Sequence, residues 1–266
     1  MATTHDQARR MNAPRAVALC QCFNGALEFQ AGRWDDAEAA LQESIELHRQ
    51  LGAASGEALA WQRLGVLRTA RGEYDQAMAA LQEGLATAEQ AVMRAHCLAR
   101  LYASMASNRL QAGDHDAAQE ALQLGLAMGE RHGSCTTCDA LLLPIAVKVS
   151  LAQDKQQAAE DYCRQLDRAA EDYGSQAWLA MAAEAKGELA KARDDLDLAI
   201  EHFGEAQKLF QTAGSRYQAA MTLAALADLR LRASDGKSER QEALQLKSTA
   251  INKLEALGAP APAFLQ

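Results

Sequence analysis

Cysteine and histidine are the residues of this chain whose spacing could support metal or thiol chemistry. Cys135 and Cys138 form a C-x-x-C pair in the segment GSCTTCDALLLP. Cys97 lies 41 residues before Cys138 (position 97 to position 138), His96 precedes it, and His132 precedes the pair. Thiolates and imidazoles at such spacing could hold zinc or Cu(I), and a C-x-x-C pair can also be a redox couple. One interpretation is therefore a three- or four-ligand metal or redox site formed by Cys97, Cys135 and Cys138 with His96 or His132.

A buried structural role is the alternative for these thiols. Free cysteine behaves as a small hydrophobe and fills gaps between alanine-rich helices. Structural zinc sites commonly carry a second C-x-x-C pair, and this sequence has none. Three interpretations of the pair therefore stay open: a metal or thiol sensor, an intramolecular disulfide, and buried structural cysteines.

The elements that must position these residues follow from an internal repeat. Residues 61–77, WQRLGVLRTARGEYDQA, contain W-x-x-L-G and then G-x-Y-x-x-A. Gly65 would let a neighbouring helix approach closely, and Gly72 would close the first helix in a turn. The small residue of the second helix recurs at positions 37, 77, 118, 159 and 199, in steps of 40, 41, 41 and 40. Five copies at a near-constant step predict stacked helix pairs.

The pattern resembles the tetratricopeptide repeat (TPR) family. The resemblance implies an all-α, right-handed α-α superhelix, a TPR-like solenoid of about 12 antiparallel helices. We expect residues 13–257 to form one domain of about six helix pairs, between a mobile N-terminus (1–12) and a tail (258–266). The stretches CTTCDALLLP, GSQAWLAMAAEAKGELA and SRYQAAMTLAALADLRL also resemble the helical sensor region of bacterial LuxR-type ATP-dependent transcription regulators.

The resemblance to TPR arrays further implies that the first helix of each pair lines a concave groove. A groove that is apolar at one end and charged at the other would suit an amphipathic peptide or helix. The Lys/Asn clamp for a C-terminal carboxylate is not matched in the first two pairs. Aligning the repeats gives these candidate groove residues: Phe29, Gln62, Arg100, Ser107, Asn108, Lys148, Glu184, Glu188 and Lys191.

No residue set suggests catalysis. G-x-S-x-G, H-E-x-x-H and glycine-rich phosphate loops do not occur, and Asp and Glu are scattered at helical spacing. His48 and His202 lie among charged residues, so we expect them to be solvated. His115 takes the place that Trp34 and Tyr74 hold in other copies, so we expect it to pack at a helix start. The chain is predicted to have no catalytic residues.

Composition and charge exclude other classes of protein. The 27 basic and 35 acidic side chains give a formal charge of −8, so direct nucleic-acid binding is not expected. No apolar run reaches the roughly 18 residues of a membrane helix, and the N-terminus lacks a signal-peptide pattern. We expect a cytoplasmic chain.

Three functions remain open from the sequence. The first is a non-enzymatic module without cofactor that binds a protein or peptide, and the resemblance implies the sensor or scaffold array of a bacterial transcriptional regulator as its setting. The second is a thiol-dependent sensor with zinc or Cu(I) at Cys97, Cys135 and Cys138. The third is an array that binds a small-molecule effector. Self-association through the ends of the solenoid is a further possibility.

Overall fold

The structure is a computed structural model that describes residues 4–133 and 135–265. These residues form thirteen α-helices and one short 3₁₀ helix, and no strand occurs among them. The predicted all-α class with TPR-like helix pairs is confirmed, with one helix more than expected. The chain divides into two compact units, Met1–Cys138 and Asp139–Gln266, which we describe separately.

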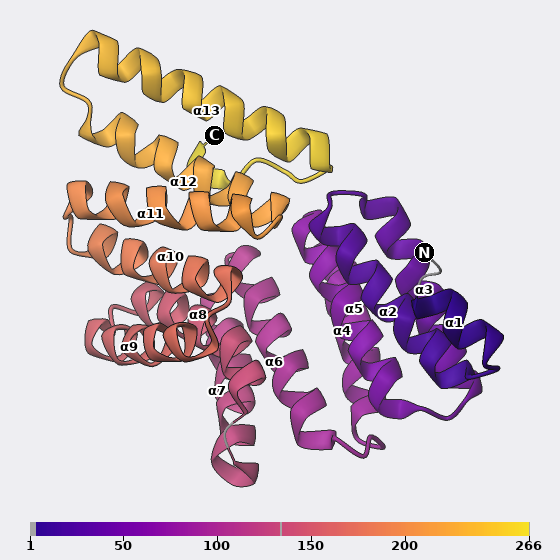
Figure 1. The fold of residues 1–266 in the computed structure, drawn as a ribbon. Coiled ribbons are helices and arrows are strands. Elements are labelled where there is room, and N and C mark those ends of the chain that lie inside the picture. The colour runs from indigo at the N-terminus through magenta and orange to yellow at the C-terminus, as the bar shows by residue number, and fades with distance from the viewer. Residues whose placement is uncertain (1–3, 134, 266) are drawn as a thin grey trace. The chain divides into compact units, whose positions relative to one another are not determined.

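The first unit contains three complete helix pairs, and consecutive helices lie antiparallel (Figure 1). A short helix at the N-terminus packs against the first pair. The last residues of this unit begin a further helix. The helices are α1 (Thr4–Arg10), α2 (Pro14–Gln30), α3 (Trp34–Gln50), α4 (Ala54–Ala70), α5 (Tyr74–Ala88), α6 (Arg94–Gln111), α7 (His115–His132) and the start of α8 (Thr136–Ala152).

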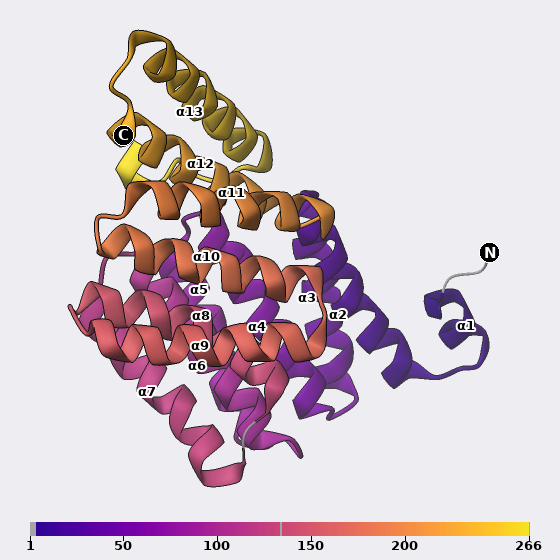
Figure 2. The ribbon, with the colours of Figure 1, turned by 60° about the vertical axis from the view of Figure 1, so that its left-hand side comes forward.

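The second unit contains the rest of α8 and five further helices. Figure 2 shows α9 to α12 as neighbouring rods stacked in chain order. Their bounds are α9 (Gln156–Tyr173), α10 (Gln176–Ala192), α11 (Leu196–Thr212), α12 (Arg216–Ala233) and α13 (Lys237–Leu257). The 3₁₀ helix η1 (Ala263–Leu265) contacts α12, and Leu265 is buried.

Glycines on first helices let second helices pack closely. A Cβ added to Gly65 would lie 2.5 Å from the side chain of Leu81, which is closer than non-bonded carbon atoms approach one another. A Cβ on Gly187 would likewise lie 2.7 Å from the ring of Phe203. The predicted close approach at Gly65 is confirmed, and the same slot recurs in the second unit.

In the fourth copy the sizes of the two residues at this contact are reversed. Val147 replaces the glycine of the first helix, and Cys163 replaces the large residue of the second helix. Both side chains are buried in one cluster with Leu143 and Leu166. A larger residue on one helix therefore accompanies a smaller one on its partner, as close packing requires. Cys163 has a packing role that explains its presence.

The turns within the pairs use left-handed backbone. Gly72 has a φ of 77°, as the sequence predicts for the residue that ends α4. Asp154 and Asp194 stand at the equivalent turns of later pairs and have φ of 56° and 60°. Aspartate tolerates this conformation better than most residues because its short side chain can satisfy nearby backbone groups. The period thus persists where glycine is lost.

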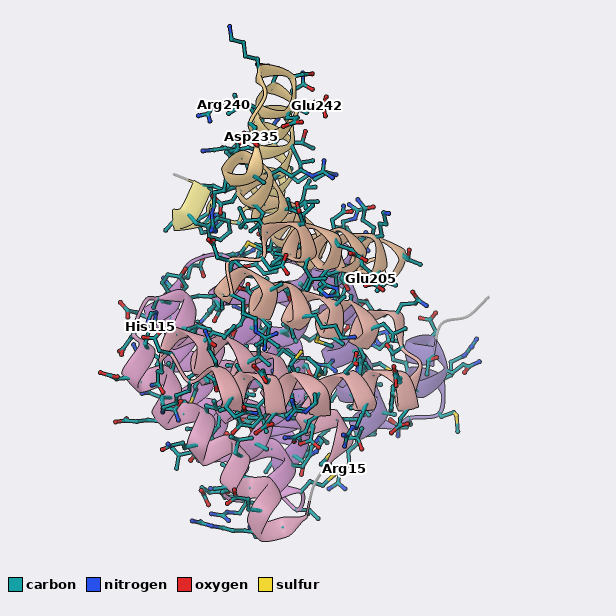
Figure 3. The ribbon with its side chains drawn as sticks, turned by 90° about the vertical axis from the view of Figure 1, so that its left-hand side faces the viewer. Arg15, His115, Glu205, Asp235, Arg240 and Glu242 are labelled. Atoms are coloured by element: carbon teal, nitrogen blue, oxygen red, sulfur yellow. The ribbon has the colours of Figure 1, made fainter. Side chains whose placement is uncertain are left out.

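Two predictions about histidines were wrong. His115 begins α7 and is exposed, at the periphery of the structure in Figure 3, so it does not pack as Trp34 does. The shorter, polar imidazole has less apolar surface to bury than an indole ring. His48, by contrast, is buried and not solvated. Its ring packs on Gly56 of the next pair, where a Cβ would lie 2.1 Å from Nε2.

The buried imidazole of His48 predicts that acid destabilises the first unit. Burial lowers the pKa of His48 below its ordinary 6.5, although a hydrogen bond to the Ser44 carbonyl and the charge of Glu57 oppose this. The unfolded chain therefore binds the proton first. The neutral ring's contribution to stability is present above pH 6.5 and is lost as pH falls toward the folded pKa.

Denaturant unfolding at about pH 7.5 and about pH 5 tests this expectation in the wild type and in His48→Gln. Glutamine packs worse at both pH values, but it does not titrate. We expect the stability gap between the two proteins to narrow at the lower pH. An unchanged gap would show that His48 does not carry the effect.

Candidate functional site

A cluster of two thiols and one imidazole lies where α6 meets the start of α8. The Sγ atoms of Cys135 and Cys138 are 3.4 and 3.1 Å from Nδ1 of His96. The three ligand atoms all lie within 4.8 Å of one another. Ligands at about 2.3 Å (sulfur) and about 2.0 Å (nitrogen) from one metal ion lie about 3.5 Å apart at a tetrahedral angle. The spacing of the cluster therefore fits a shared ion.

The start of α8 places both sulfurs on the same side. Cys135 precedes the helix and Cys138 lies in its first turn, where the Cys138 N–H donates to the Cys135 carbonyl at 2.8 Å. Cys138 is buried and Cys135 is partly exposed. The sequence predicted that this pair lies at a helix start with His96 or His132 nearby, and the structure places His96 there.

Two predicted members do not join the cluster. Cys97 is buried and its Sγ points to the carbonyl oxygen of Ser55 on α4, at 3.9 Å. Successive residues of a helix point about 100° apart, so His96 and Cys97 cannot both face α8. His132 is exposed at the end of α7 and is not a member of the group.

The surroundings of the thiols give them different pKa values. Burial alone would raise the pKa of Cys135, but hydrogen bonds from Thr137 and Cys138 outweigh it and lower that pKa. Burial raises the pKa of Cys97, and it raises the pKa of Cys163 to about 11. Burial and the charge of Arg100 lower the pKa of His96. Cys135 is thus more acidic than Cys97 and Cys163, and it lies beside a neutral imidazole that can donate a lone pair.

A recess lined in part by His96 opens between α4 and α6. It is lined by Ser55, Ala58, Leu59, Gln62, Met93, His96, Cys97 and Arg100. Most of the lining is apolar, with polar groups from both helices. These are first helices of adjacent pairs, on which the sequence predicted a binding groove. The two predicted groove residues Gln62 and Arg100 both line the recess.

Arg100 brings an uncompensated charge to this recess. Its Nη1 donates to the Thr137 carbonyl at 3.4 Å, and its buried Nε has no hydrogen-bond partner among the described residues. The described part of the chain places no carboxylate within ion-pair distance of it. The Oε1 of Gln62 is a second buried atom without a partner there. The recess is therefore lined by a cation that has no carboxylate partner among the described residues.

Three other predicted groove residues of the first unit have different surroundings. Asn108 is fully buried and its Nδ2 donates to Thr69 Oγ1 at 3.0 Å and to the Tyr74 carbonyl at 3.2 Å. Phe29 is buried and stacks on Trp34. Neither side chain is exposed for ligand binding as the sequence predicted. Ser107 is half-buried.

Gln62 also contributes to the contact between helices. Its Nε2 donates to Ser104 Oγ at 2.7 Å, so the side chain is buried except at the recess. This bond and that of Asn108 join α4 to α6 through polar groups. They satisfy buried donors that would otherwise cost about 1–3 kcal/mol each.

The charged groove residues of the second unit bind one another. Lys148 Nζ lies 3.3 Å from Glu184 Oε1, and Lys191 pairs with Glu188. Although burial alone lowers the pKa of Lys148, Glu184 and Glu188 raise it. Lys148 is thus an ion-pair partner within its unit and not a free cation, whereas Arg100 has no such partner among the described residues.

Sequence reasoning missed Ser55, Leu59 and Met93 as lining residues. Leu59 stands 41 residues before Arg100, one repeat step, so the alignment that gave Arg100 could also have given Leu59. Ser55 and Met93 lie at or just before helix starts, outside the repeat pattern, and had no comparable signal.

Comparison with known families supports the repeat assignment for the first two pairs. The family model described as tetratricopeptide repeat matches residues 15–90. That segment runs from α2 to the end of α5 and includes the α4 wall of the recess. A search of curated proteins found no match.

Two solved structures show the same fold. BtubC (BKLC) from P. vanneervenii aligns at 20% identity with a TM-score of 0.54, over 85% of this chain and 92% of that one. A Rap protein complexed with Competence and Sporulation Factor aligns at 14% identity with a TM-score of 0.67. That alignment covers 95% of this chain and 66% of the Rap chain. At these identities the likeness concerns the fold alone. None of the helices described here combines the length and apolarity needed to cross a bilayer.

Proposed function

We propose that this chain is a non-enzymatic module that binds a protein or peptide segment in the α4–α6 recess. The observation that carries the proposal is Arg100, whose guanidinium lines the recess without a carboxylate partner among the described residues. An acidic side chain or a terminal carboxylate of the ligand would supply that partner. The tetratricopeptide match over residues 15–90 supports a protein-interaction role.

The lining indicates which kind of segment would fit. Ala58, Leu59 and Met93 form an apolar surface beside Arg100 and Gln62. An aliphatic side chain next to an acidic group would match this arrangement. The proposed ligand is therefore an acidic amphipathic peptide.

The proposed setting is the sensor or scaffold array of a bacterial transcriptional regulator in the cytoplasm. The sequence resemblance to such sensor regions supports it. The Rap protein, which shares the fold, was solved complexed with Competence and Sporulation Factor. An array of this kind would need no chemistry of its own, only a ligand-dependent contact surface.

Peptide selection followed by affinity measurement tests the recess. Peptides selected from a random library would be labelled and titrated by fluorescence anisotropy against the wild type, Arg100→Glu and Arg131→Glu. Arg131 is an exposed arginine of α7 in the same unit and serves as the matched control. We expect acidic peptides to be selected and Arg100→Glu to weaken them at least about 10-fold, because like charges then meet. Equal affinities for the two variants would contradict the proposal.

A further inference from the structure

We propose that His96, Cys135 and Cys138 form a three-ligand site for Cu(I). The site goes beyond the proposed peptide-binding function, and His96 and Arg100 contribute to both. Both sulfurs lie within 3.4 Å of the same nitrogen, Nδ1 of His96; Cys138 lies in the first turn of α8 and Cys135 directly precedes that helix. Thiolate and imidazole are the ligands that Cu(I) and zinc prefer in proteins.

The number of ligands favours Cu(I) over zinc. Among the described residues, the group of nearby cysteine, histidine and carboxylate ligands has three members. Zinc in structural sites is held by four protein ligands in a tetrahedron, and this cluster would leave one position to water. Cu(I) accepts a lower coordination number than zinc and prefers soft ligands such as thiolates. Cys97, the remaining thiol nearby, points toward α4 and cannot complete a tetrahedron.

The charge around the cluster favours the same ion. Arg100 interacts electrostatically with Cys135 and Cys138 and donates to the carbonyl of Thr137 between them. Two thiolates that bind Cu(I) carry one net negative charge, which the guanidinium neutralises. With Zn²⁺ the same ligands would already be neutral, and Arg100 would add an unbalanced positive charge in a partly buried place.

Binding is an exchange of protons for metal. Cu(I) displaces one proton from each thiol that is protonated, and the neutral imidazole supplies the third lone pair. No electron is transferred and no disulfide forms. The lone pair of Nδ1 must be free, so the ring proton resides on Nε2, the nitrogen away from the sulfurs.

The test uses the full chain, reduced and kept without oxygen. Cu(I) would be supplied from a bicinchoninate buffer and Zn²⁺ from a chromophoric chelator, with thermal melting to confirm that each variant is folded. We expect one Cu(I) per chain, and an affinity at least about 100-fold weaker in Cys135→Ser, Cys138→Ser and His96→Gln. Cys97→Ser and Cys163→Ser, which remove buried thiols outside the cluster, should retain wild-type affinity.

Arg100→Met examines the charge argument by itself. We expect it to weaken Cu(I) binding and to leave Zn²⁺ binding unchanged or stronger. Three outcomes would overturn the proposal: no stoichiometric Cu(I), equal dependence on Cys97, or tighter binding of Zn²⁺ than of Cu(I) through these ligands. Peptide affinity measured in Cys135→Ser keeps this result distinct from the proposed function, because Cys135 does not line the recess.

Discussion

Replacing Phe203 with alanine is expected to destabilise the second unit by about 3–5 kcal/mol, the range for a buried aromatic residue. Phe203 is fully buried and its ring lies directly over Gly187. Its edge also packs in a cluster with Ala199 and Leu229. Removing the ring leaves a cavity that the backbone of Gly187 cannot fill, because glycine has no side chain to move into it.

Denaturant unfolding of the full chain would measure this loss, with Phe264→Ala as the control. Phe264 lies in the same unit but is 52% exposed, so its truncation should cost less than about 1 kcal/mol. Because the chain has two units, the transition of residues 139–266 must be followed separately, for example through amide hydrogen exchange in that segment. Similar losses for the two variants would show that the slot over Gly187 is not tightly packed.

Replacing Gly65 with valine is expected to destabilise the first unit by about 3 kcal/mol. The new Cβ would lie 2.5 Å from Leu81, so either the side chain or the helix must shift. Gly129→Val, on α7, is the matched control, because no atom lies within 4 Å of the site where its Cβ would be. That variant should be neutral or slightly stabilising, since valine favours helix more than glycine does.

A second substitution should rescue Gly65→Val. The fourth repeat pairs Val147 with Cys163, so Leu81→Cys would reproduce that combination in the second repeat. We expect Leu81→Cys alone to lower the free energy of unfolding by about 2 kcal/mol. The loss in the double variant should be at least about 1 kcal/mol smaller than the sum of the losses in the two single variants. If the losses of the two single variants simply add in the double variant, the summed side-chain volume at this contact is not what the repeats preserve.

The repeat period predicted the helix pairs because it depends on contacts that recur in every pair. Gly65, Leu81 and Gly72 each have equivalents one step away, so the pattern reports the local packing several times over. His48 shows the limit of this reasoning. Its neighbours in sequence are charged, but the glycine at position 56 leaves space for its ring. That contact joins two pairs, and the charged neighbours of His48 in sequence do not reveal it.

The candidate site was predicted only in part for a geometrical reason. Cys97 and Cys138 occupy equivalent places on first helices, which suggested that they meet. Equivalent places in a stacked array point in the same direction, so such side chains do not face one another. The residue that reaches Cys138 must come from a different position of the helix, and His96 does. Asn108 stands one repeat step after Leu67, which is buried. Because the two positions are equivalent in the repeat, Asn108 is buried as well.

His96 belongs to the wall of the recess and to the thiol cluster at once. One ring therefore connects two candidate binding events. An ion that fixes the orientation of this ring changes the surface that a peptide meets, and the peptide then changes the affinity for the ion by the same factor. Such a coupling free energy needs no movement of helices. Copper binding and peptide binding would then jointly determine the state of the surface that His96 forms.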